Sequence, residues 1–415
     1  MAVIRPFNAL RPTQNLAHLV ASVPYDVVNT EEAKELAANN EHTLLRVTRS
    51  EIEFPANTNP YSDDIYKKAA ENLNKLISKG SLINDAEDRI YLYKLEMDGR
   101  TQTGIAATFS VDDYDNDVIM KHEKTRKEKE DDRTKHIVTT GAQTGPVFLT
   151  YRGSATIDSI VKEVCKDNQP LYMFTAPDGI KHTVWVLPTD YNDTFVSEIK
   201  AIDKLYIADG HHRAASASRA RAAKKEANKA HKGSEEYNYF IAVLFPADQL
   251  AILPYNRVVT DLNGKTKEEF LNEISEKFMV EQVGQKTPHD KRTFSMYLDG
   301  NWYMIKVRDA VLASLSLSKS VGDQLDVSIL QSFLLNPILG IDDPRTNKRV
   351  DFVGGIRGTA ELEKLVNSKK FAVAFSMFPV TVDDLMNISD AGEIMPPKST
   401  WFEPKLRDGL LIHQI

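Results

Sequence analysis

The sequence of 415 residues has little cysteine and no long apolar run. Its single cysteine, Cys165, cannot form a disulfide within the chain, which indicates a reducing compartment and excludes a cysteine-rich zinc site. No stretch approaches the roughly 20 apolar residues that span a bilayer, and the first residues lack the basic start and apolar run of a signal peptide. We therefore expect a cytoplasmic protein without a membrane anchor.

The sequence also lacks an excess of positive charge. It contains 52 Lys and Arg against 59 Asp and Glu, which gives a formal net charge of −7. Proteins whose main ligand is duplex DNA usually have a strongly basic face, so this balance argues against DNA as a partner. The hydrophobic share of 42% is ordinary for a globular chain of two or three domains. Nothing in the composition indicates an oligomeric state.

Several common catalytic motifs are missing. The sequence has no GxxxxGKS/T loop, no HRD and DFG pair, no HExxH and no GxSxG. P-loop enzymes, protein-kinase-like enzymes, zincins and α/β-hydrolases are therefore not supported by any motif. The glycines at 354–358 match neither GxGxxG nor the Walker spacing, and we interpret them as a turn.

Hydrophobic periodicity predicts helices that alternate with strands. Apolar residues at helical spacing predict amphipathic or buried helices at 63–79, 267–278 and 327–336. Extended runs on both sides of Asp98-Gly99 and of Asp299-Gly300 predict two short-turn β-hairpins.

Further strands are expected at 204–208, 238–246 and 371–378, and the tail 395–405 is expected to be a loop. This alternation predicts an α+β fold with mixed sheets. We place provisional domains at 1–120, 121–265, which would hold the catalytic core, and 266–415.

The most informative segment is the strand that ends at Asp209-Gly210 and the Ala-rich helix expected from His211 to about Lys232. The start of a helix offers free backbone N–H groups and a positive dipole end to an anion. The next residues, His212 and Arg213, add donors and a guanidinium fork that suits phosphate. Asp209 is a candidate Mg²⁺ ligand or proton acceptor. The structural alternative is that Asp209 only caps the helix, which leaves the His-His-Arg run unexplained.

The string DGHHRAASA at 209–217 resembles the strand–turn–helix signature of the ParB/sulfiredoxin-like superfamily, which includes free serine kinases. Four further strings resemble a large, mostly uncharacterised family of bacterial and protist proteins that has the same turn. They are VPYDVV at 23–28, KHEKT at 121–125, LPYNRVV at 253–259 and MPPKSTWFEPKL at 395–406. The resemblance covers nearly the whole chain and implies a ParB/sulfiredoxin-like core. It also implies that Asp209, His211, His212 and Arg213 handle the donor phosphates and their Mg²⁺ ion.

The densely charged segment 121–136 has two interpretations. It is either a solvated helix or loop, or a lid that folds over a polyanion. In the second case Glu123 is the candidate general base for a hydroxyl acceptor. The candidate anion-binding residues of this segment are Lys121, His122, Thr125, Arg126 and Arg133. Asp26 is the rival base, and its structural alternative is a turn or cap carboxylate.

Two segments near the C-terminal half also contain candidate binding residues. Asn256 and Arg257 follow an apolar run and suit a carboxylate or phosphate, although an arginine there is often part of a structural ion pair. Lys398, Ser399 and Thr400 lie beside prolines and Trp401, where a rigid backbone would place a cation and two hydroxyls in a cleft. A structural C-terminal clasp is the alternative.

Together these features predict a small-molecule kinase that converts L-serine to O-phospho-L-serine, with Mg²⁺ and a phosphoanhydride donor. Pyrophosphate is favoured over ADP or ATP because no adenine-binding pattern is evident. Two alternatives stay open. One is a ParB-like nucleotide-binding regulator or DNA-associated protein in which the turn senses a nucleotide. The other is a kinase of a different hydroxylated metabolite.

Overall fold

The computed structural model describes residues 1–415, and the chain folds as two compact units. Unit 1 consists of Met1–Leu250 and Pro404–Ile415, and unit 2 consists of Ala251–Glu403. The domain boundaries expected at 120 and 265 do not coincide with these units. Strands on both sides of residue 120 pair in one sheet, and this pairing holds residues 1–250 together.

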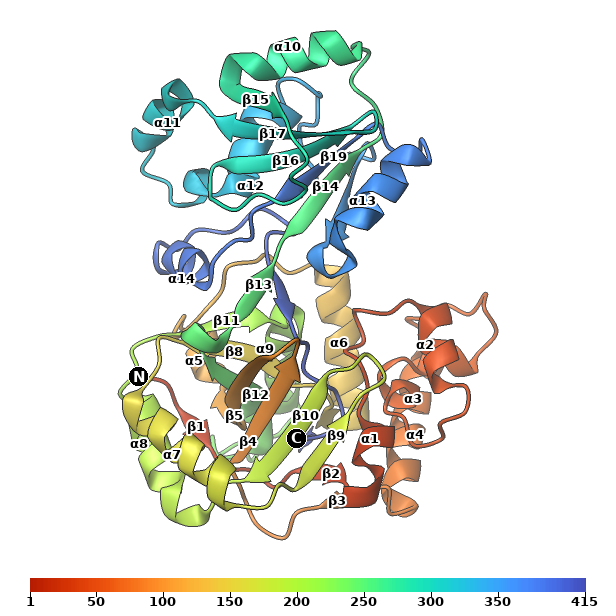
Figure 1. Ribbon diagram of the computed structural model, residues 1–415. Coiled ribbons are helices and arrows are strands. Elements are labelled where there is room, and N and C mark those ends of the chain that lie inside the picture. The colour runs from red at the N-terminus through yellow and green to blue at the C-terminus, as the bar shows by residue number, and fades with distance from the viewer. The chain divides into compact units, whose positions relative to one another are not determined.

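Unit 1 is built on a nine-stranded mixed sheet (Figure 1). The strand order is β6 (Ile119–Met120), β11 (Leu205–Asp209), β8 (Val147–Tyr151), β12 (Tyr239–Pro246), β5 (Arg100–Ser110), β4 (Tyr91–Met97), β10 (Lys181–Val186) and β9 (Tyr172–Thr175), with β1 (Ile4–Arg5) paired to β5. Neighbouring strands are antiparallel except for the parallel pairs β11–β6 and β12–β8. The mixed sheet confirms the expected α+β class.

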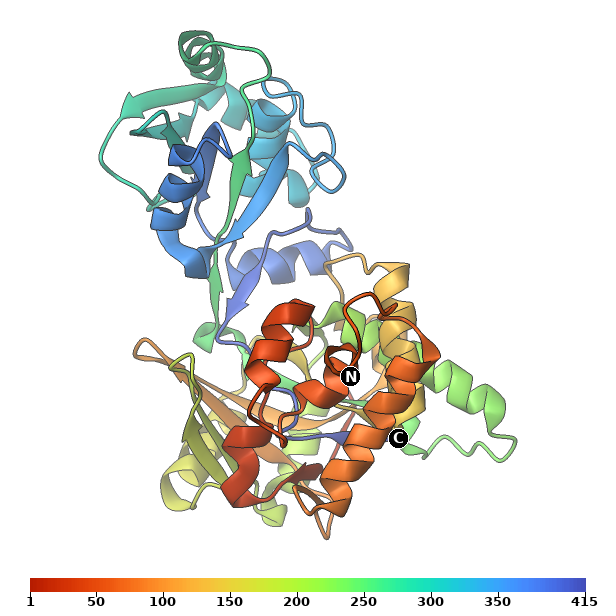
Figure 2. The same ribbon diagram turned by 90° about the vertical axis from the view of Figure 1, so that its right-hand side faces the viewer.

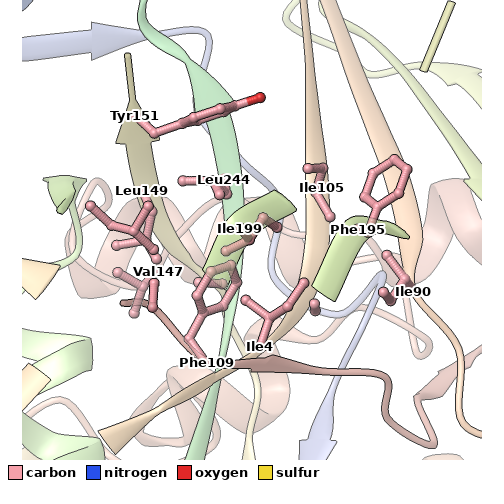
Figure 3. Close-up of a cluster of buried hydrophobic side chains, with 14 of the residues drawn as sticks. Ile4, Ile90, Ile105, Phe109, Val147, Leu149, Tyr151, Phe195, Ile199 and Leu244 are labelled. Carbon is pink, nitrogen blue, oxygen red and sulfur yellow. The ribbon is translucent and has the colours of Figure 1, made fainter. Parts of the chain in front are cut away.

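The main core of unit 1 lies between this sheet and two helices, α7 (Ala155–Asp167) and α8 (Asn192–Lys200). Side chains of a strand alternate between its two faces, so Ile105 and Phe109 of β5 point to the same side. Figure 3 shows both residues near Phe195 and Ile199 of α8, and all four are buried. This packing fixes the register of the central strands, because a shift by one residue would turn these side chains to the opposite face.

A second group of helices in unit 1 packs around α6 (Lys127–Thr140). The helix α6 packs against both α4 (Asp63–Ser78) and α9 (His211–Ala227). In Figure 2, α4 is orange and α6 is yellow-orange. The predicted helix 63–79 is confirmed as α4, which ends just before Gly80, whose φ is +70°. No helix combines the length and the apolar character that a bilayer crossing requires.

Both predicted hairpins are confirmed. Strands β4 and β5 form the first, and β16 (Thr293–Leu298) and β17 (Asn301–Val307) form the second. In each turn the aspartate and the glycine have positive φ, with values of 51° and 76° in one and 47° and 78° in the other. Two successive positive φ values match the twist of an antiparallel pair, which explains why Asp-Gly is the favoured sequence at this position.

The C-terminal segment 404–415 returns to unit 1 and ties several of its segments together. Asp408 forms a reciprocal pair of backbone hydrogen bonds with Ser22, at 3.0 and 2.9 Å. Ile412 bonds to Leu10 in the same way, and β21 (His413–Gln414) pairs with β7 (Ala142–Gln143). These contacts place Lys405 and Asp408, two charged residues of the segment, at defined positions in unit 1.

Unit 2 contains a six-stranded antiparallel sheet. Its order is β15 (Phe278–Gln282), β17, β16, β19 (Val373–Met377), β14 (Tyr255–Val259) and β18 (Val350–Gly354). The predicted helix 267–278 is confirmed as α10 (Lys267–Lys277). The predicted helix 327–336 starts as α12 (Asp326–Leu330) and continues as a π-helix over Gln331–Leu335.

Two expected boundaries differ from the structure. The helix α9 ends at Ala227, five residues before the expected end near Lys232. The tail expected to be a loop contains a strand, β20 (Trp401–Glu403), which pairs with β13 (Ala251–Leu253). Trp401 of β20 packs directly on Gly354, where an added Cβ would lie 2.6 Å from the Trp401 ring. Packing rather than local propensity therefore makes this segment a strand.

Replacing Phe109 by alanine is expected to destabilise unit 1 by about 3–5 kcal/mol, because the side chain is fully buried in the main core and its loss leaves a cavity. Urea unfolding monitored by circular dichroism measures the loss. Met173→Ala, at a side chain that is 62% exposed, is the control and should change stability by about 0.5 kcal/mol or less. Equal effects of the two substitutions would contradict this assignment of the core.

Candidate functional site

The predicted strand–turn–helix is present, with β11 ending at Asp209 and α9 starting at His211. Gly210 joins them with a φ of +93°, a conformation that glycine adopts without steric cost. A Cβ on Gly210 would lie 3.1 Å from Nε of Arg213, so glycine also leaves room for this side chain over the turn. No side chain caps the start of α9, and its first turn contains no acidic residue. Asp209 is therefore not a helix cap.

Asp209 instead forms ion pairs with two cations. Its Oδ2 lies 3.1 Å from Nη2 of Arg213 and 3.5 Å from Nζ of Lys405, and its side chain is 31% exposed. Burial alone would raise the pKa of Asp209, but Lys405 and Arg213 outweigh burial and lower this pKa to about 2. The carboxylate stays ionised and holds both cations at the end of β11.

Two buried histidines lie next to this carboxylate. The rings of His122 and His211 meet edge to face, with centroids 4.4 Å apart. Burial lowers the pKa of His122 to about 4 and holds the pKa of His211 well below its usual value, so both rings are neutral near pH 7. The charge of Asp209 and, less strongly, the Ile207 carbonyl oppose this lowering of the His122 pKa, but neither ring nitrogen of His122 makes a hydrogen bond of normal geometry. The site therefore contains polar nitrogen atoms that no protein group satisfies.

The segment 121–126 lies against the turn. The backbone N–H of His122 approaches Nε2 of His211 at 3.5 Å, and that of Arg126 donates to Nε2 of His212 at 3.1 Å. Glu123 is half exposed, and its Oε2 lies 3.8 Å from Nδ1 of His211. The KHEKT string and the DGHHR turn, which are far apart in sequence, thus form one site.

Other predicted residues of the charged segment have local partners. Nζ of Lys121 pairs with Asp117 at 2.7 Å, and the hydroxyl of Thr125 donates to Glu130. Arg133 is on α6, where its Nε bonds to Asp132 at 2.9 Å and its guanidinium stacks on the Tyr25 ring at 4.2 Å. Burial, which acts most strongly, and the charge of Arg126 lower the pKa of His212, while Asp26 opposes them.

A small pocket with a partly apolar lining borders Arg213. Its lining includes Tyr25, Arg133, Arg213 and Asp408, which converge from four separate parts of the chain. Nε of Arg213 and Oδ1 of Asp408 are buried without partners. Burial raises the pKa of Asp408 to about 7, partly opposed by the charge of Arg213. A Cβ on Gly145 would lie 2.1 Å from Oδ1 of Asp408, so only glycine permits this approach.

Asp26 is exposed, one residue beyond the pocket-lining Tyr25. Its charge raises the pKa of both His212 and Arg213, which indicates that Asp26 lies near the turn. The structure thus places both candidate bases, Glu123 and Asp26, around the same turn.

The remaining predicted residues belong to unit 2. Oδ1 of Asn256 accepts a hydrogen bond from the Met377 backbone at 3.0 Å, inside the sheet. The hydroxyl of Ser399 is buried and donates to the Pro396 carbonyl at 2.6 Å, while Lys398 is exposed and Thr400 is half-buried. Arg257 is buried, and its partners are backbone carbonyls rather than the carboxylate that a structural ion pair would need.

Sequence reasoning missed three residues of the unit 1 site, namely Tyr25, Lys405 and Asp408. Two of them lie inside strings singled out from the sequence, since VPYDVV contains Tyr25 and MPPKSTWFEPKL contains Lys405. Asp408 lies outside every string, and only the return of the C-terminal segment brings it to the pocket.

The turn does not form a metal cage from protein ligands alone. Asp209 is already paired with two cations, and no group of three or more His, Cys, Asp and Glu side chains is arranged to hold a metal ion. Mg²⁺ commonly binds proteins through one or two carboxylates and completes its shell with water and substrate phosphates. The expected Mg²⁺ is therefore compatible with the site only as part of a phosphate ligand.

The chain belongs to the family described as "Protein of unknown function (DUF1015)", whose model matches residues 4–328. No curated protein matches the sequence.

Among solved structures, the chain is similar to a free serine kinase in complex with AMP, with 12% identity, a TM-score of 0.36, and coverage of 75% of this chain and 91% of that chain. It is also similar to SbnI with a C-terminal truncation from Staphylococcus aureus, with 10% identity, a TM-score of 0.38, and coverage of 74% and 86%. A conserved hypothetical protein from Pyrococcus furiosus matches with 12% identity, a TM-score of 0.34, and coverage of 74% and 94%.

Replacing Asp209 by asparagine is expected to lower stability at pH 7 by about 1–3 kcal/mol, because Arg213 and Lys405 lose their shared partner. The folded pKa of about 2 lies below the unfolded value of about 3.9, so the carboxylate stabilises the fold above pH 4. This contribution is lost as the pH falls from about 4 toward 2, and the wild type and the variant should then converge.

Urea unfolding at pH 7, 5 and 3 measures this convergence. The control is Asp190→Asn, at an exposed carboxylate of unit 1. A stability difference between wild type and Asp209→Asn that does not change with pH would show that the ion pairs are not its cause.

Proposed function

We propose that unit 1 is a phosphotransferase that moves a phosphoryl group from a phosphoanhydride donor to the hydroxyl of L-serine. The observation that carries this proposal is the convergence at one turn of a carboxylate, two cations and two neutral imidazoles, beside an uncapped helix start. Phosphoryl transfer depends on positioning and on stabilising the charge on the transferred oxygens. Cations and N–H donors at one point supply both requirements.

The donor is bound at the start of α9 in this proposal. The free backbone N–H groups of the helix and the imidazole of His211 donate to the phosphate oxygens, while Arg213 and Lys405 turn from Asp209 toward the donor. The freed carboxylate of Asp209 would hold Mg²⁺, which would supply positive charge to the donor phosphates. Pyrophosphate is the favoured donor because cations around two phosphates are sufficient for its recognition, and ADP and ATP are the alternatives.

The acceptor is bound in the pocket behind Arg213. An amino acid carries a carboxylate and an ammonium group. The pocket offers Arg133 and Arg213 to the carboxylate and Asp408 to the ammonium group. The unpartnered Nε of Arg213 and Oδ1 of Asp408 support this choice, since buried polar atoms normally have a partner. Arg213 lies between the two substrates, which places the serine hydroxyl toward the donor.

The reaction is a direct displacement. The serine oxygen attacks the terminal phosphorus, the P–O bond of the anhydride breaks, and the leaving phosphate or nucleotide takes its electron pair. The hydroxyl proton passes to a carboxylate base. Glu123 is the leading candidate because it lies at the turn, 3.8 Å from the neutral ring of His211, and is half exposed to an incoming substrate. Asp26 is the rival.

Removing either His211 or Arg213 as alanine variants is expected to lower turnover by about 100-fold or more, on the scale seen when one charge-stabilising donor is lost. ³¹P NMR of the protein with L-serine, Mg²⁺ and pyrophosphate, ADP or ATP in parallel tubes detects the phosphomonoester. Arg221→Ala is the matched control, because Arg221 lies farther along α9 and pairs with Asp112 at 2.6 Å.

Full activity of the His211 or Arg213 variant would refute this site. A wild-type product that forms only with another alcohol would retain the reaction class and change the acceptor. No product from any tube, together with tight and salt-sensitive DNA retention, would favour the regulator instead.

The two candidate bases are separated by Glu123→Gln and Asp26→Asn, which remove the proton acceptor and keep the size of the side chain. The base variant should lower kcat by about 100-fold or more with a small change in KM, because the carboxylate acts on the proton in the transition state. We expect this loss for Glu123→Gln. A near-normal rate there and a large loss for Asp26→Asn would transfer the role to Asp26, and circular dichroism checks that both variants fold.

A further inference from the structure

A buried arginine in unit 2 has no acidic partner. Arg257 lies on β14, in the interior of the sheet, and is 4% exposed. Its guanidinium donates to the backbone carbonyls of Tyr255 and, at 3.2 Å, Lys398, and it forms no ion pair. By contrast, the partly buried Arg292 of the same unit pairs with Asp326 at 3.0 Å, so a carboxylate balances its charge. The charge of Arg257 is the exception.

An uncompensated charge in this position is unfavourable unless a further group neutralises it. Removing a guanidinium from water is costly, and two backbone carbonyls satisfy two of its five N–H donors and none of its charge. Burial accordingly lowers the pKa of Arg257 to about 10. The arrangement is that of a cation prepared for an anion that is not part of the chain.

Arg257 borders a small pocket that is otherwise mostly apolar. The walls include Val327, Leu335, Phe352 and Pro396, and the amide of Gln331 is the main other polar group. The guanidinium lies 5.3 Å from the centre of the Phe352 ring. A guanidinium fork at one end of an apolar pocket suits a ligand with one planar anionic group and a short apolar part.

Two unusual backbone conformations coincide at this pocket. Gln331 and Leu335 are the first and last residues of the π-helix, a rare conformation that occurs frequently at functional sites. Lys398, whose carbonyl holds the guanidinium, has a φ of +56°, which is unusual for a residue with a side chain. Backbone strain of this kind persists where the surrounding structure requires it and is often found at ligand sites.

We propose that this pocket of unit 2 binds the carboxylate of a small organic acid through a bidentate ion pair with Arg257. The apolar part of the acid lies against Phe352 and Leu335. A single guanidinium matches the single charge of a monocarboxylate, whereas a phosphate dianion would leave one charge uncompensated in apolar surroundings. The site is independent of the reaction proposed for unit 1.

The test uses 3,3,3-trifluoropropionate as a probe and the broadening of its ¹⁹F NMR line by the full-length protein. The wild type should broaden the line at millimolar probe concentrations, and unlabelled propionate should restore it. Arg257→Met should weaken binding by about 10-fold or more, since it removes charge-assisted hydrogen bonds. Arg257→Lys should weaken it also, because it retains the charge and loses the bidentate fork.

Two control variants locate the probe. Arg345→Met removes an exposed arginine of unit 2 and should bind the probe like the wild type. Arg213→Met removes a carboxylate-binding arginine of unit 1 and should retain the part of the binding that Arg257→Met weakens. Thermal unfolding of each variant without ligand provides a second measurement. Because an unpaired buried charge is replaced by an apolar side chain, Arg257→Met should be at least as stable as the wild type.

The proposal is overturned if the wild type leaves the probe line unchanged, or if Arg257→Met broadens it equally. A competition experiment with Arg213→Met compares inorganic phosphate with propionate. If phosphate displaces the probe more effectively than propionate, the pocket is a phosphate site instead. If Arg257→Met melts well below the wild type, Arg257 is a structural bridge between Tyr255 and Lys398. The loss of binding in Arg257→Met then carries no information, and probe binding by Arg257→Lys is the deciding measurement. Unchanged binding by Arg257→Lys would refute the proposal.

Discussion

The ionised carboxylate of Asp209 is the interaction on which the unit 1 site depends. It ends β11, faces Arg213 one turn into α9, and pairs with Lys405 from the C-terminal segment. Two parts of the chain that are far apart in sequence, the β11–α9 turn and the C-terminal segment, are thereby held at one point. The carboxylate also offsets part of the positive charge of Arg213 and Lys405, which would otherwise be unfavourable next to buried histidines. In the proposed reaction a donor phosphate would take over the role of the carboxylate, because its charge has the same sign.

The two units contain buried arginines in opposite electrostatic situations. Arg213 has a carboxylate partner and borders a pocket with a second carboxylate, Asp408. Arg257 has only carbonyl partners in an apolar pocket. The first arrangement suits a ligand with charges of both signs, and the second suits a single anion. Glycine makes the first arrangement possible, since Gly210 and Gly145 allow charged side chains to approach the backbone closely.

Local patterns were sufficient to predict the elements and the turn. Helical spacing located α4 and α10, Asp-Gly located both hairpins, and the apolar run before Asp209 located β11. Two features failed because they depend on packing. The strand β20 forms only where β13 accepts it, and the extent of unit 1 follows from pairing between strands far apart in sequence. The structural alternative that Asp209 only caps the helix is wrong, because its carboxylate pairs with Arg213 and Lys405 and no side chain caps α9.

The sequence by itself determined the class of fold, the position of the DGHHR turn and the residue types gathered there, because these follow from periodicity and residue type over short distances. Tertiary structure alone decided which charges meet. It brought Lys405 and Asp408 to a turn some two hundred residues earlier, joined His122 to His211, and left Asn256 bonded inside a sheet. Charge pairing acts through space over a few ångströms, and distance along the chain carries no information about it.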